Sequence, residues 1–254
     1  MNEDGFIVFE DVHKSFGSLH VLGGLSFEVR RGETLTIIGQ SGTGKSVTLR
    51  CLLGLLTPDE GRVLYEGRCV AEMDEQELVE LRSHFGMLFQ GSALFDSLNV
   101  GDNVAFGLRA RGGKDEEETR DVVERTLRAV GLPGIQEKMP AELSGGMKKR
   151  VALARAVAME PDVLLYDEPT TGLDPIMADA INNLILSMQR AYQVTSIAVT
   201  HDLTSAYKIS DRMIMLHEGR VVGEGTPDEI RNTTDPMMRQ FIEGKAEGPI
   251  KAVM

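Results

Sequence analysis

Two features are scarce in this 254-residue sequence: it has only two cysteines, Cys51 and Cys69, and no long apolar run. Two cysteines cannot supply a disulfide framework, so the composition fits a reducing compartment. The longest apolar stretches, such as 51–56, fall far short of the roughly 20 residues that a membrane-spanning helix needs. The acidic start, 1–5, lacks the apolar core of a secretory signal. We therefore expect a soluble, cytosolic chain that another protein must hold if it works at a membrane.

Basic residues are also in deficit, with 27 Lys and Arg against 39 Asp and Glu and a formal charge of −12. Proteins that recognise the phosphate backbone of nucleic acids need clustered basic surface, so we expect no nucleic-acid partner. Apolar material, by contrast, is plentiful. The hydrophobic share is 42%, which is enough to bury a sizeable core.

Strands and helices alternate along the chain, which predicts an α/β fold with a largely parallel sheet. Apolar runs predict strands at 7–9, 25–29, 34–38, 85–89, 163–166 and 194–199, and a late hairpin over 213–222. The stretch 90–160 is mostly helical in pattern. Helix starts are predicted where an aspartate precedes a helical pattern, at Asp74, Asp174 and Asp235.

The most specific motif is the run 39–46, GQSGTGKS, which matches the phosphate-binding pattern GxxxxGK[ST] in full. Its glycines let backbone N–H groups surround phosphate oxygens, and the helix that follows adds its positive N-terminal end. Lys45 can reach the β- and γ-phosphates, and the Ser46 hydroxyl can ligate Mg²⁺. An ordinary glycine turn is the alternative, but the motif lies between a predicted strand and a predicted helix, as a nucleotide site requires. The predicted ATP-binding residues are Gly39, Gln40, Ser41, Gly42, Thr43, Gly44, Lys45, Ser46 and Val47.

Two acids follow the apolar run 163–166. Asp167 at the end of the predicted strand can hold the Mg²⁺ shell, and Glu168 can polarise an attacking water. Taken alone, such a pair is more often part of a solvated loop. In the same chain as a phosphate loop, it indicates the catalytic side of an ATP site.

The order of the remaining motifs resembles that of the ATP-binding cassette (ABC) ATPases. The phosphate loop is followed by Gln90 as the Q-loop, by 143–147 (LSGGM) as the signature, and by Asp167 and Glu168. The run 172–174 then resembles the D-loop, and His201 the switch histidine. The resemblance spans about residues 5 to 230.

This resemblance implies a P-loop NTPase (RecA-like) core over 1–90 and 160–230 with an antiparallel β lobe, and an inserted helical subdomain at 91–159. It also implies a head-to-tail homodimer, in which each ATP lies between one chain's phosphate loop and the partner's signature. The residues that this dimer would bring to the nucleotide are Ser144, Gly145, Gly146 and Asp174.

Individual roles follow from the same resemblance. Glu168, His201 and Gln90 are expected to be catalytic, with Gln90 also touching the metal together with Ser46 and Asp167. Phe16 resembles the aromatic residue that stacks on adenine. Each has a plainer alternative: Gln90 as a surface glutamine, His201 as an ordinary core or surface residue, Phe16 as part of the core, and Ser144–Gly146 as a helix cap and turn.

A narrower resemblance rests on Met147, where the family often has glutamine, with 148–150 and the C-terminal runs 239–244 and 247–249. These resemble the ATPase of Mla-type phospholipid transporters. That resemblance implies phospholipid transport between inner and outer membranes, an integral membrane permease, a lipid-binding MCE-domain protein and, as often in such transporters, a small STAS-domain subunit. The chain would then be peripheral, held by the permease at the cytoplasmic face of the inner membrane.

Two other functional classes of ABC ATPase remain as alternatives. One is the ATPase of an importer for polar solutes, which only Met147 and the C-terminal tail separate from the lipid transporter. The other is an ABC ATPase of DNA repair or translation. Those proteins carry long coiled-coil insertions or two cassettes per chain, whereas the insert here is only about 70 residues and has no sustained heptads.

Two segments are candidate contact surfaces. The first lies between 90 and 106, where we expect a permease to dock on apolar side chains, with anchoring of the helical lobe as the alternative: Leu94, Phe95, Leu98, Val100, Val104 and Phe106. The second is 231–254, predicted as a helix with one apolar face and then an extended arm over 246–254, ending in Ile250, Val253 and Met254. We expect this arm to lie on a partner, with packing on its own domain as the alternative.

Overall fold

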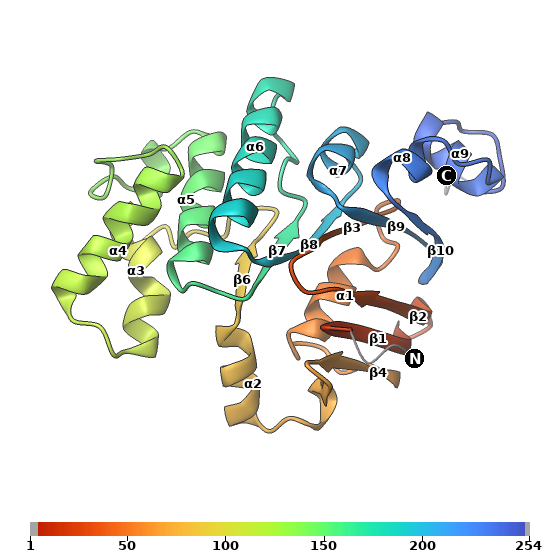
Figure 1. Cartoon of the computed structure of the whole chain (residues 1–254), viewed down its shortest axis with the longest axis horizontal. Helices are drawn as coiled ribbons and strands as arrows, with labels where there is room; N and C mark the ends of the chain where they lie inside the picture. The colour runs from red at the N-terminus through yellow and green to blue at the C-terminus, as the bar shows by residue number, and fades with distance from the viewer. Residues whose placement is uncertain (1–4, 252–254) are drawn as a thin grey trace. The chain divides into compact units, whose positions relative to one another are not determined.

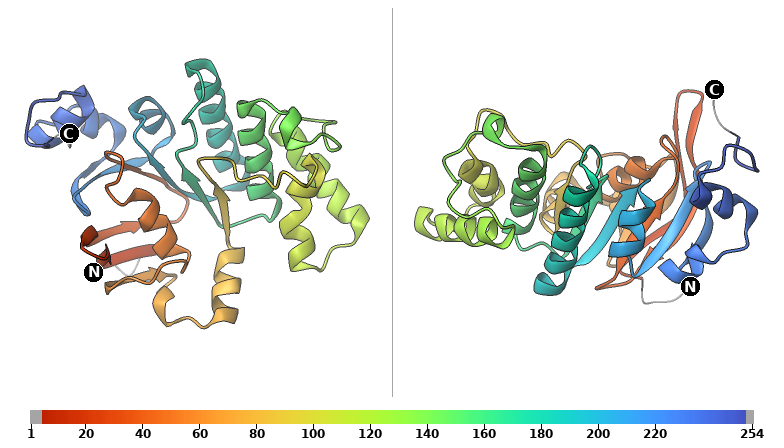
Figure 2. Two further views of the ribbon diagram at one scale, coloured as in Figure 1. Left: turned by 180° about the vertical axis from the view of Figure 1, so that it is seen from behind. Right: turned by 90° about the horizontal axis from the view of Figure 1, so that it is seen from above.

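The computed structural model describes residues 5–251, which form two compact units. The first unit comprises the described residues of Met1–Leu78 and Ile197–Met254, and the second comprises Val79–Ser196. Figure 1 labels the elements, and Figure 2 gives two further views. The chain passes between the units within α2 (Glu75–Ser83) and within β8 (Thr195–Thr200).

A four-stranded antiparallel sheet with the order β2-β1-β4-β5 forms one part of the first unit. Its strands are β1 (Ile7–Phe16), β2 (Leu19–Val29), β4 (Glu60–Tyr65) and β5 (Arg68–Cys69). Phe9 of β1 stacks on Phe27 of β2, with 4.4 Å between the ring centroids. The sheet confirms the expected antiparallel lobe. The sequence did not predict β4, because only its last three residues carry an apolar pattern and the first three, Glu60 to Arg62, are exposed.

A mainly parallel set of strands forms the other part of the first unit, in the order β10-β9-β3-β8. The remaining elements of this unit are β3 (Thr34–Ile38), α1 (Lys45–Leu52), a short 3-10 turn (Val70–Glu72), α7 (Leu203–Ile209), β9 (Arg212–His217), β10 (Arg220–Gly225), α8 (Pro227–Arg231) and α9 (Pro236–Glu243). Strand β3 pairs parallel with β9, and β10 returns antiparallel beside β9 as the predicted hairpin. Every residue of β3 and β8 is buried, as expected for parallel strands covered on both faces.

The second unit combines two parallel strands with a group of helices. Its elements are β6 (Phe85–Leu88), α3 (Val100–Arg111), α4 (Glu116–Ala129), a 3-10 turn (Pro140–Glu142), α5 (Gly145–Ala158), β7 (Val163–Asp167) and α6 (Pro175–Tyr192). Strand β6 pairs parallel with β7, so that Leu88 lies opposite Tyr166. Helix α5 packs against α3, α4, α6 and β6, and α3, α4 and α5 lie side by side in Figures 1 and 2.

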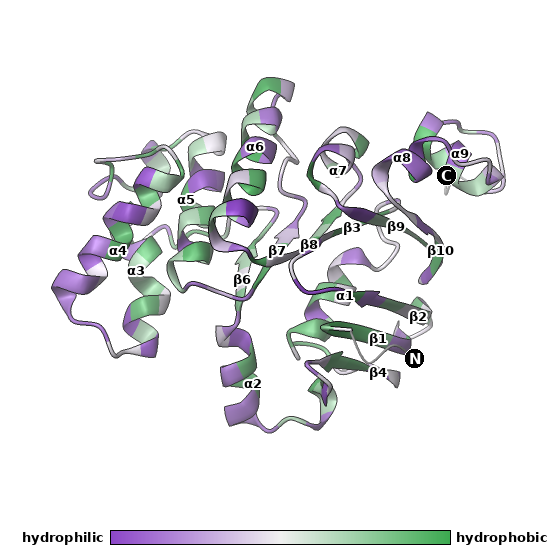
Figure 3. Ribbon diagram, viewed as in Figure 1, coloured by the Kyte–Doolittle hydropathy of each residue, from purple (hydrophilic) through white to green (hydrophobic). Residues whose placement is uncertain are grey.

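The amphipathic helices begin where the sequence predicts. The Asp74 carboxylate accepts a hydrogen bond from the Glu77 amide at 2.9 Å, and Glu77 accepts one in return from the Asp74 amide. Asp174 and Asp235 cap α6 and α9 in the same position. Such caps contribute about 0.5–2 kcal/mol each. Figure 3 shows α4 as mostly hydrophilic with apolar bands, and four apolar residues of α4 and its C-cap are buried: Val122, Val123, Leu127 and Val130.

The C-terminal segment packs on its own unit, which corrects our expectation of an arm laid on a partner. Ile250 is 3% exposed and joins a core cluster with Met213, Met215 and Met238. The side-chain amide of Gln240 donates to the Ile250 carbonyl at 2.9 Å and accepts from the Ile250 amide at 2.7 Å. The predicted apolar face of α9 lies in or against this cluster: Met237, Met238, Phe241 and Ile242. The other two apolar residues of the proposed arm, Val253 and Met254, lie outside the described residues.

Both cysteines are free thiols, as expected. Burial raises the pKa of the Cys51 thiol to about 11, which makes this side chain a hydrophobic core group at neutral pH. Across residues 5–251, no helix combines the length and apolar character that a membrane span requires.

Candidate active site

The phosphate loop joins β3 to α1 in the first unit, and its backbone requires glycine at both ends. Gly39 is buried with φ of +154°, and a Cβ there would lie 2.4 Å from the Leu216 carbonyl oxygen. Gly44, the N-cap residue of α1, has φ of +99°, and a Cβ there would lie 3.0 Å from the Val21 carbonyl oxygen. No side chain caps the start of α1 by a hydrogen bond. The loop therefore turns backbone amides, not side chains, toward the space before the helix, as an anion site requires.

Lys45 is the first residue of α1 and is only 6% exposed. Its ammonium donates hydrogen bonds of 2.8 Å to the carbonyl oxygens of Gly39 and Gln40. The Thr43 hydroxyl also donates to the Gln40 carbonyl, at 2.9 Å. These bonds close the loop around the lysine and hold a positive charge beside its amides. The arrangement fits the polyphosphate of a nucleotide, with which Lys45 would form charge-assisted hydrogen bonds.

Two further predicted residues belong to the first unit. Phe16 ends β1 and is 46% exposed, so the alternative that it belongs to the core is wrong. The strand end that carries it is fixed by Asp59, which accepts from the Lys14 ammonium and the Ser15 amide, both at 2.7 Å. These two bonds hold the pKa of the Asp59 carboxyl below its usual range. His201 is exposed and follows β8 directly, just before the N-cap residue of α7.

Asp167 is the last residue of β7 in the second unit and Glu168 follows it directly, and neither side chain is exposed to solvent as in an open loop. Glu168 is 8% exposed, and its φ of +49° is one that non-glycine residues seldom adopt. Its carboxylate accepts a hydrogen bond from the Thr171 hydroxyl at 3.1 Å. A buried carboxylate at the end of a parallel strand is placed as a general base requires, at the sheet edge where ligands bind.

Lys149, which the sequence analysis did not place in the ATP site, connects two of the predicted site residues. It lies in the second turn of α5 and is 4% exposed. Its ammonium donates to the Gln90 carbonyl and, at 3.3 Å, to the Glu168 carbonyl. Burial lowers the pKa of Lys149, while the charges of Asp167 and Glu168 act in the opposite direction. Gln90 follows β6 and is exposed, so its side chain is accessible while its backbone is held.

The signature residues form the start of α5. Ser144 is its N-cap residue, and the Ser144 hydroxyl accepts from the Met147 amide at 3.3 Å. Gly145 and Ser144 are exposed, whereas Gly146 is buried, and a Cβ there would lie 2.4 Å from the Met177 methyl group of α6. Asp174, the D-loop residue, uses its side chain to cap α6, accepting from two backbone amides. The helix cap that we considered as the alternative is thus present, and it leaves Ser144 and Gly145 exposed at the start of α5.

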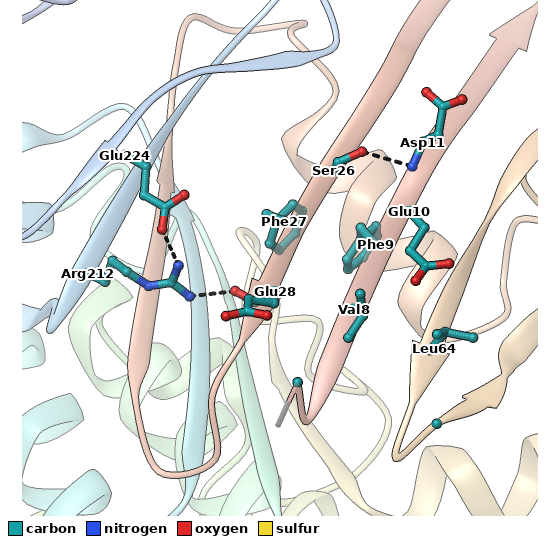
Figure 4. A pocket seen from close by; sticks show the side chains of 12 residues that line it. Val8, Phe9, Glu10, Asp11, Ser26, Phe27, Glu28, Leu64, Arg212 and Glu224 are labelled. Atoms are coloured by element: carbon teal, nitrogen blue, oxygen red, sulfur yellow. Dashed lines mark hydrogen bonds and ion pairs between the residues drawn. The ribbon is translucent and has the colours of Figure 1, made fainter. Parts of the chain in front are cut away.

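A pocket of about 750 Å³ lies on the antiparallel sheet of the first unit, away from these motifs (Figure 4). Phe9 and Phe27 line it, together with Arg212, which pairs with Glu224 and donates to the Glu28 carbonyl. Arg212 also pairs with Glu33 at 2.7 Å, so its charge is neutralised by groups of the fold. The described residues that line this pocket include no predicted site residue, and we assign it no part in the nucleotide chemistry.

The predicted site residues thus fall into two groups. The phosphate loop, Phe16 and His201 belong to the first unit, while the acids after β7, Gln90 and the signature belong to the second. Within each unit, the structure brings the members of the phosphate loop together and links Gln90 to Glu168 through Lys149. Lys149 was missed because a lysine in an amphipathic helix is normally an exposed residue. The available signal was its place in a run of three basic residues, 148–150, directly before the apolar part of α5.

The known proteins that this chain resembles include ATP-binding transport proteins, in agreement with the phosphate loop described above. The chain matches the family described as ABC transporter over residues 22–171. It is 42% identical to the chloroplastic protein TRIGALACTOSYLDIACYLGLYCEROL 3 of Arabidopsis thaliana, covering 98% of this chain and 77% of that protein. It is also 42% identical to Mkl of Mycobacterium leprae, a probable ribonucleotide transport ATP-binding protein, covering 93% of this chain and 68% of that protein.

A third relative is MlaF of Haemophilus influenzae, the ATP-binding protein of an intermembrane phospholipid transport system. It is 39% identical and covers 92% of this chain and 89% of that protein. Among solved structures, the dimeric ATP-binding cassette MJ0796 bound to ADP and Pi has a TM-score of 0.80 at 31% identity, covering 87% of this chain and 98% of that chain. The expected α/β P-loop fold is confirmed by this likeness. Because the family match spans more than half of the chain and the relatives cover nearly all of it, the chain belongs to the ABC transporter family, as an ATP-binding subunit that hydrolyses ATP.

Proposed function

We propose that this ATPase drives phospholipid transport between the inner and outer membranes through a separate integral membrane permease. Support for the lipid substrate comes from MlaF, the phospholipid transport relative, which the chain matches over 89% of its length. Met147 and the C-terminal runs described above point the same way. On this proposal the chain is a peripheral protein at the cytoplasmic face of the inner membrane.

The nucleotide chemistry is assigned residue by residue. Backbone amides of the phosphate loop and Lys45 bind the phosphates of ATP, and Phe16 stacks on the adenine. Ser46, Gln90 and Asp167 would hold Mg²⁺, because all three offer the oxygen ligands that this ion prefers. Bound Mg²⁺ would neutralise charge that develops on the phosphates. Glu168 accepts a proton from the attacking water, and His201 interacts with the γ-phosphate.

The second half of each ATP site is proposed to come from another copy of the chain. Ser144 and Gly145 are exposed at the start of α5, where free amides and the helix dipole favour an anion. The solved cassette of similar fold is a dimer. We therefore infer a head-to-tail homodimer in which Ser144, Gly145, Gly146 and Asp174 of one chain complete the site of its partner.

The permease contact is proposed to lie on the exposed part of the segment 90–106. Val100 and Val104 are buried and anchor α3, which is the alternative that we considered for the apolar residues of this segment. Phe95 and Phe106, by contrast, are 41% and 47% exposed. Their rings touch, with 4.5 Å between the centroids, and Arg155 lies 6.0 Å from the Phe95 ring. An exposed pair of aromatic side chains rimmed by a cation is typical of a protein–protein contact. This exposed pair is the observation in the geometry that favours a subunit of a larger complex.

An importer for polar solutes is the second candidate, because the Mkl relative is described as a probable ribonucleotide transport protein. A role in DNA repair or translation is disfavoured by the net charge of −12. The proposed complex also includes an MCE-domain lipid-binding protein, with a STAS-domain subunit as an optional member. Mass spectrometry of lipids and nucleotides carried by the purified ATPase–permease complex distinguishes the candidates. We expect bound phospholipid; a complex that retains ribonucleotides other than ATP and ADP, and no phospholipid, would favour the polar-solute importer.

A further inference from the structure

We propose that Lys149 is a positioning residue for ATP hydrolysis, which holds the backbone of Glu168 and the loop that begins at Gln90 in one fixed arrangement. The inference rests on the proposed role of Glu168 as the base, and it adds a residue to which none of the recognised motifs gives a role in ATP hydrolysis. All the groups involved belong to the second unit, so the argument uses contacts within one compact part of the chain.

The first observation is the burial of a charge at this position. Lys149 is 4% exposed although a lysine ammonium is strongly hydrated in water. Burying it is favourable only if good acceptors replace that water. The acceptors are two main-chain carbonyl oxygens, those of Gln90 and Glu168, which belong to segments 78 residues apart in the sequence (168 − 90 = 78).

The second observation is where these two carbonyls lie. Gln90 comes two residues after the end of β6 and Glu168 directly after the end of β7, and these two strands pair side by side. A single ammonium that donates to both carbonyls therefore fixes the separation between the two loops that leave this edge of the sheet. Helix α5, which carries Lys149, is the same helix whose first turn forms the signature.

The third observation is the backbone of Glu168. Its φ of +49° lies in the left-handed region, where a residue with a side chain stays only if its surroundings hold it. Two bonds to the Glu168 carbonyl do so, one from the Lys149 ammonium and one from the Thr171 amide, both at 3.3 Å. The carboxylate is held separately, by the Thr171 hydroxyl. Without the ammonium, Glu168 would keep its chemistry but lose part of the constraint on its position.

The same helix makes a second contact with this loop, further from the acids. Arg155 donates to the carbonyls of Ser92 and Ala93, two residues that also have positive φ. Loss of Lys149 should therefore loosen only the part of the loop next to Gln90, because Arg155 still holds the following residues. We expect the effect to be on catalysis and not on folding.

The test is Lys149→Met in the purified full-length chain, with steady-state ATPase kinetics, nucleotide titration and thermal unfolding measured together. Methionine keeps much of the apolar stem and removes the three N–H donors. We expect kcat to fall about tenfold or more, as for the loss of a charge-assisted hydrogen bond that matters in the transition state. ATP affinity should change less than about threefold, because the phosphate loop is untouched. Lys149→Arg, which retains a cation with several donors, should recover most of the lost kcat.

Lys148→Met is the matched control, because it makes the same change one position away on a side chain with no assigned role, and its kcat should stay near that of the parent chain. A normal kcat in Lys149→Met would overturn the proposal. So would equal losses of kcat, ATP affinity and melting temperature that Lys149→Arg does not restore, because they would show a purely structural role. Glu168→Gln, measured in parallel, tests the role of Glu168 as the base separately from the role of Lys149 in positioning it. Near-normal turnover in that variant would refute the base assignment and, with it, the inference about Lys149.

Discussion

Lys45, Lys149 and Glu168 are each less than a tenth exposed, although all three side chains are normally charged and solvated. The fold satisfies the two ammonium groups with main-chain carbonyls, and it supports Glu168 through Thr171. At the scale of single residues, these are the groups whose loss should affect ATP chemistry first. The effects of losing Lys45 and Glu168 should differ in kind, because we propose that Lys45 contacts the nucleotide and that Glu168 acts on the attacking water.

Glu168→Gln should keep ATP binding and lose hydrolysis. The amide has nearly the same shape, but it cannot accept a proton from water, so turnover should fall by about 10²–10⁴-fold. Steady-state phosphate release measures the loss, and size-exclusion chromatography with ATP should show a longer-lived dimer. Turnover close to that of the parent chain would contradict the assignment of the base.

Lys45→Ala should instead weaken nucleotide binding itself. The ammonium contributes charge-assisted hydrogen bonds worth roughly 1.5–3 kcal/mol, so affinity should fall by about 10–150-fold. Calorimetric titration with ATP measures the change. The control is Lys114→Ala, which removes an exposed ammonium from the loop between α3 and α4 and should leave the affinity nearly unchanged. Equal affinities for Lys45→Ala and the parent chain would contradict the role of Lys45.

Much of the residue-scale site could be predicted from the sequence, because the phosphate loop and the acids after β7 are local patterns with fixed spacing. The exposure of Phe16 and the role of Lys149 could not. Both depend on which neighbours the fold supplies, and a lysine or phenylalanine in isolation is compatible with either the surface or the core. Gln240 is a similar case, since its burial is explained by hydrogen bonds with the main chain of Lys245 and Ile250, which follow α9.

At the scale of elements, the sequence predicts the start of both α5 and α9, but it does not predict what the segment after α9 packs against. The signature helix α5 begins at the predicted cap, and its buried face packs on three other helices of the second unit. Helix α9 also begins at its predicted cap, but the segment after it folds back on the same unit instead of extending to a partner. The sequence shows that the terminal face is apolar, while the choice of what covers it depends on contacts that are distant in sequence.

Ile250→Ala should therefore destabilise the chain. Truncating a fully buried isoleucine usually costs about 2–5 kcal/mol, because a cavity remains in the core. Urea unfolding followed by circular dichroism measures the loss, and Lys251→Ala, an exposed neighbour, should change stability by less than about 0.5 kcal/mol. If Ile250→Ala left stability unchanged and reduced only complex assembly, the arm that we first expected would be restored.

At the scale of the whole molecule, the proposal depends on two copies that share each ATP site. Ser144→Arg should block the signature side of the site, and Lys45→Ala the phosphate-loop side. Mixing the two variants gives heterodimers with one intact composite site, which pairs Lys45 of the first chain with Ser144 of the second. We expect ATP-dependent dimers in the mixture, measured by light scattering, and little dimer from either variant alone. Normal dimerisation of each variant alone would contradict the head-to-tail arrangement.

The central claim is that ATP hydrolysis by this chain drives phospholipid movement through a permease. Its most direct test is lipid transfer by the purified ATPase–permease complex in vesicles that contain a fluorescent phospholipid. Matched samples would carry the parent chain or Glu168→Gln. The account predicts phospholipid transfer that requires ATP with the parent chain and stops with Glu168→Gln. ATP-driven uptake of a ribonucleotide without any phospholipid transfer would contradict it.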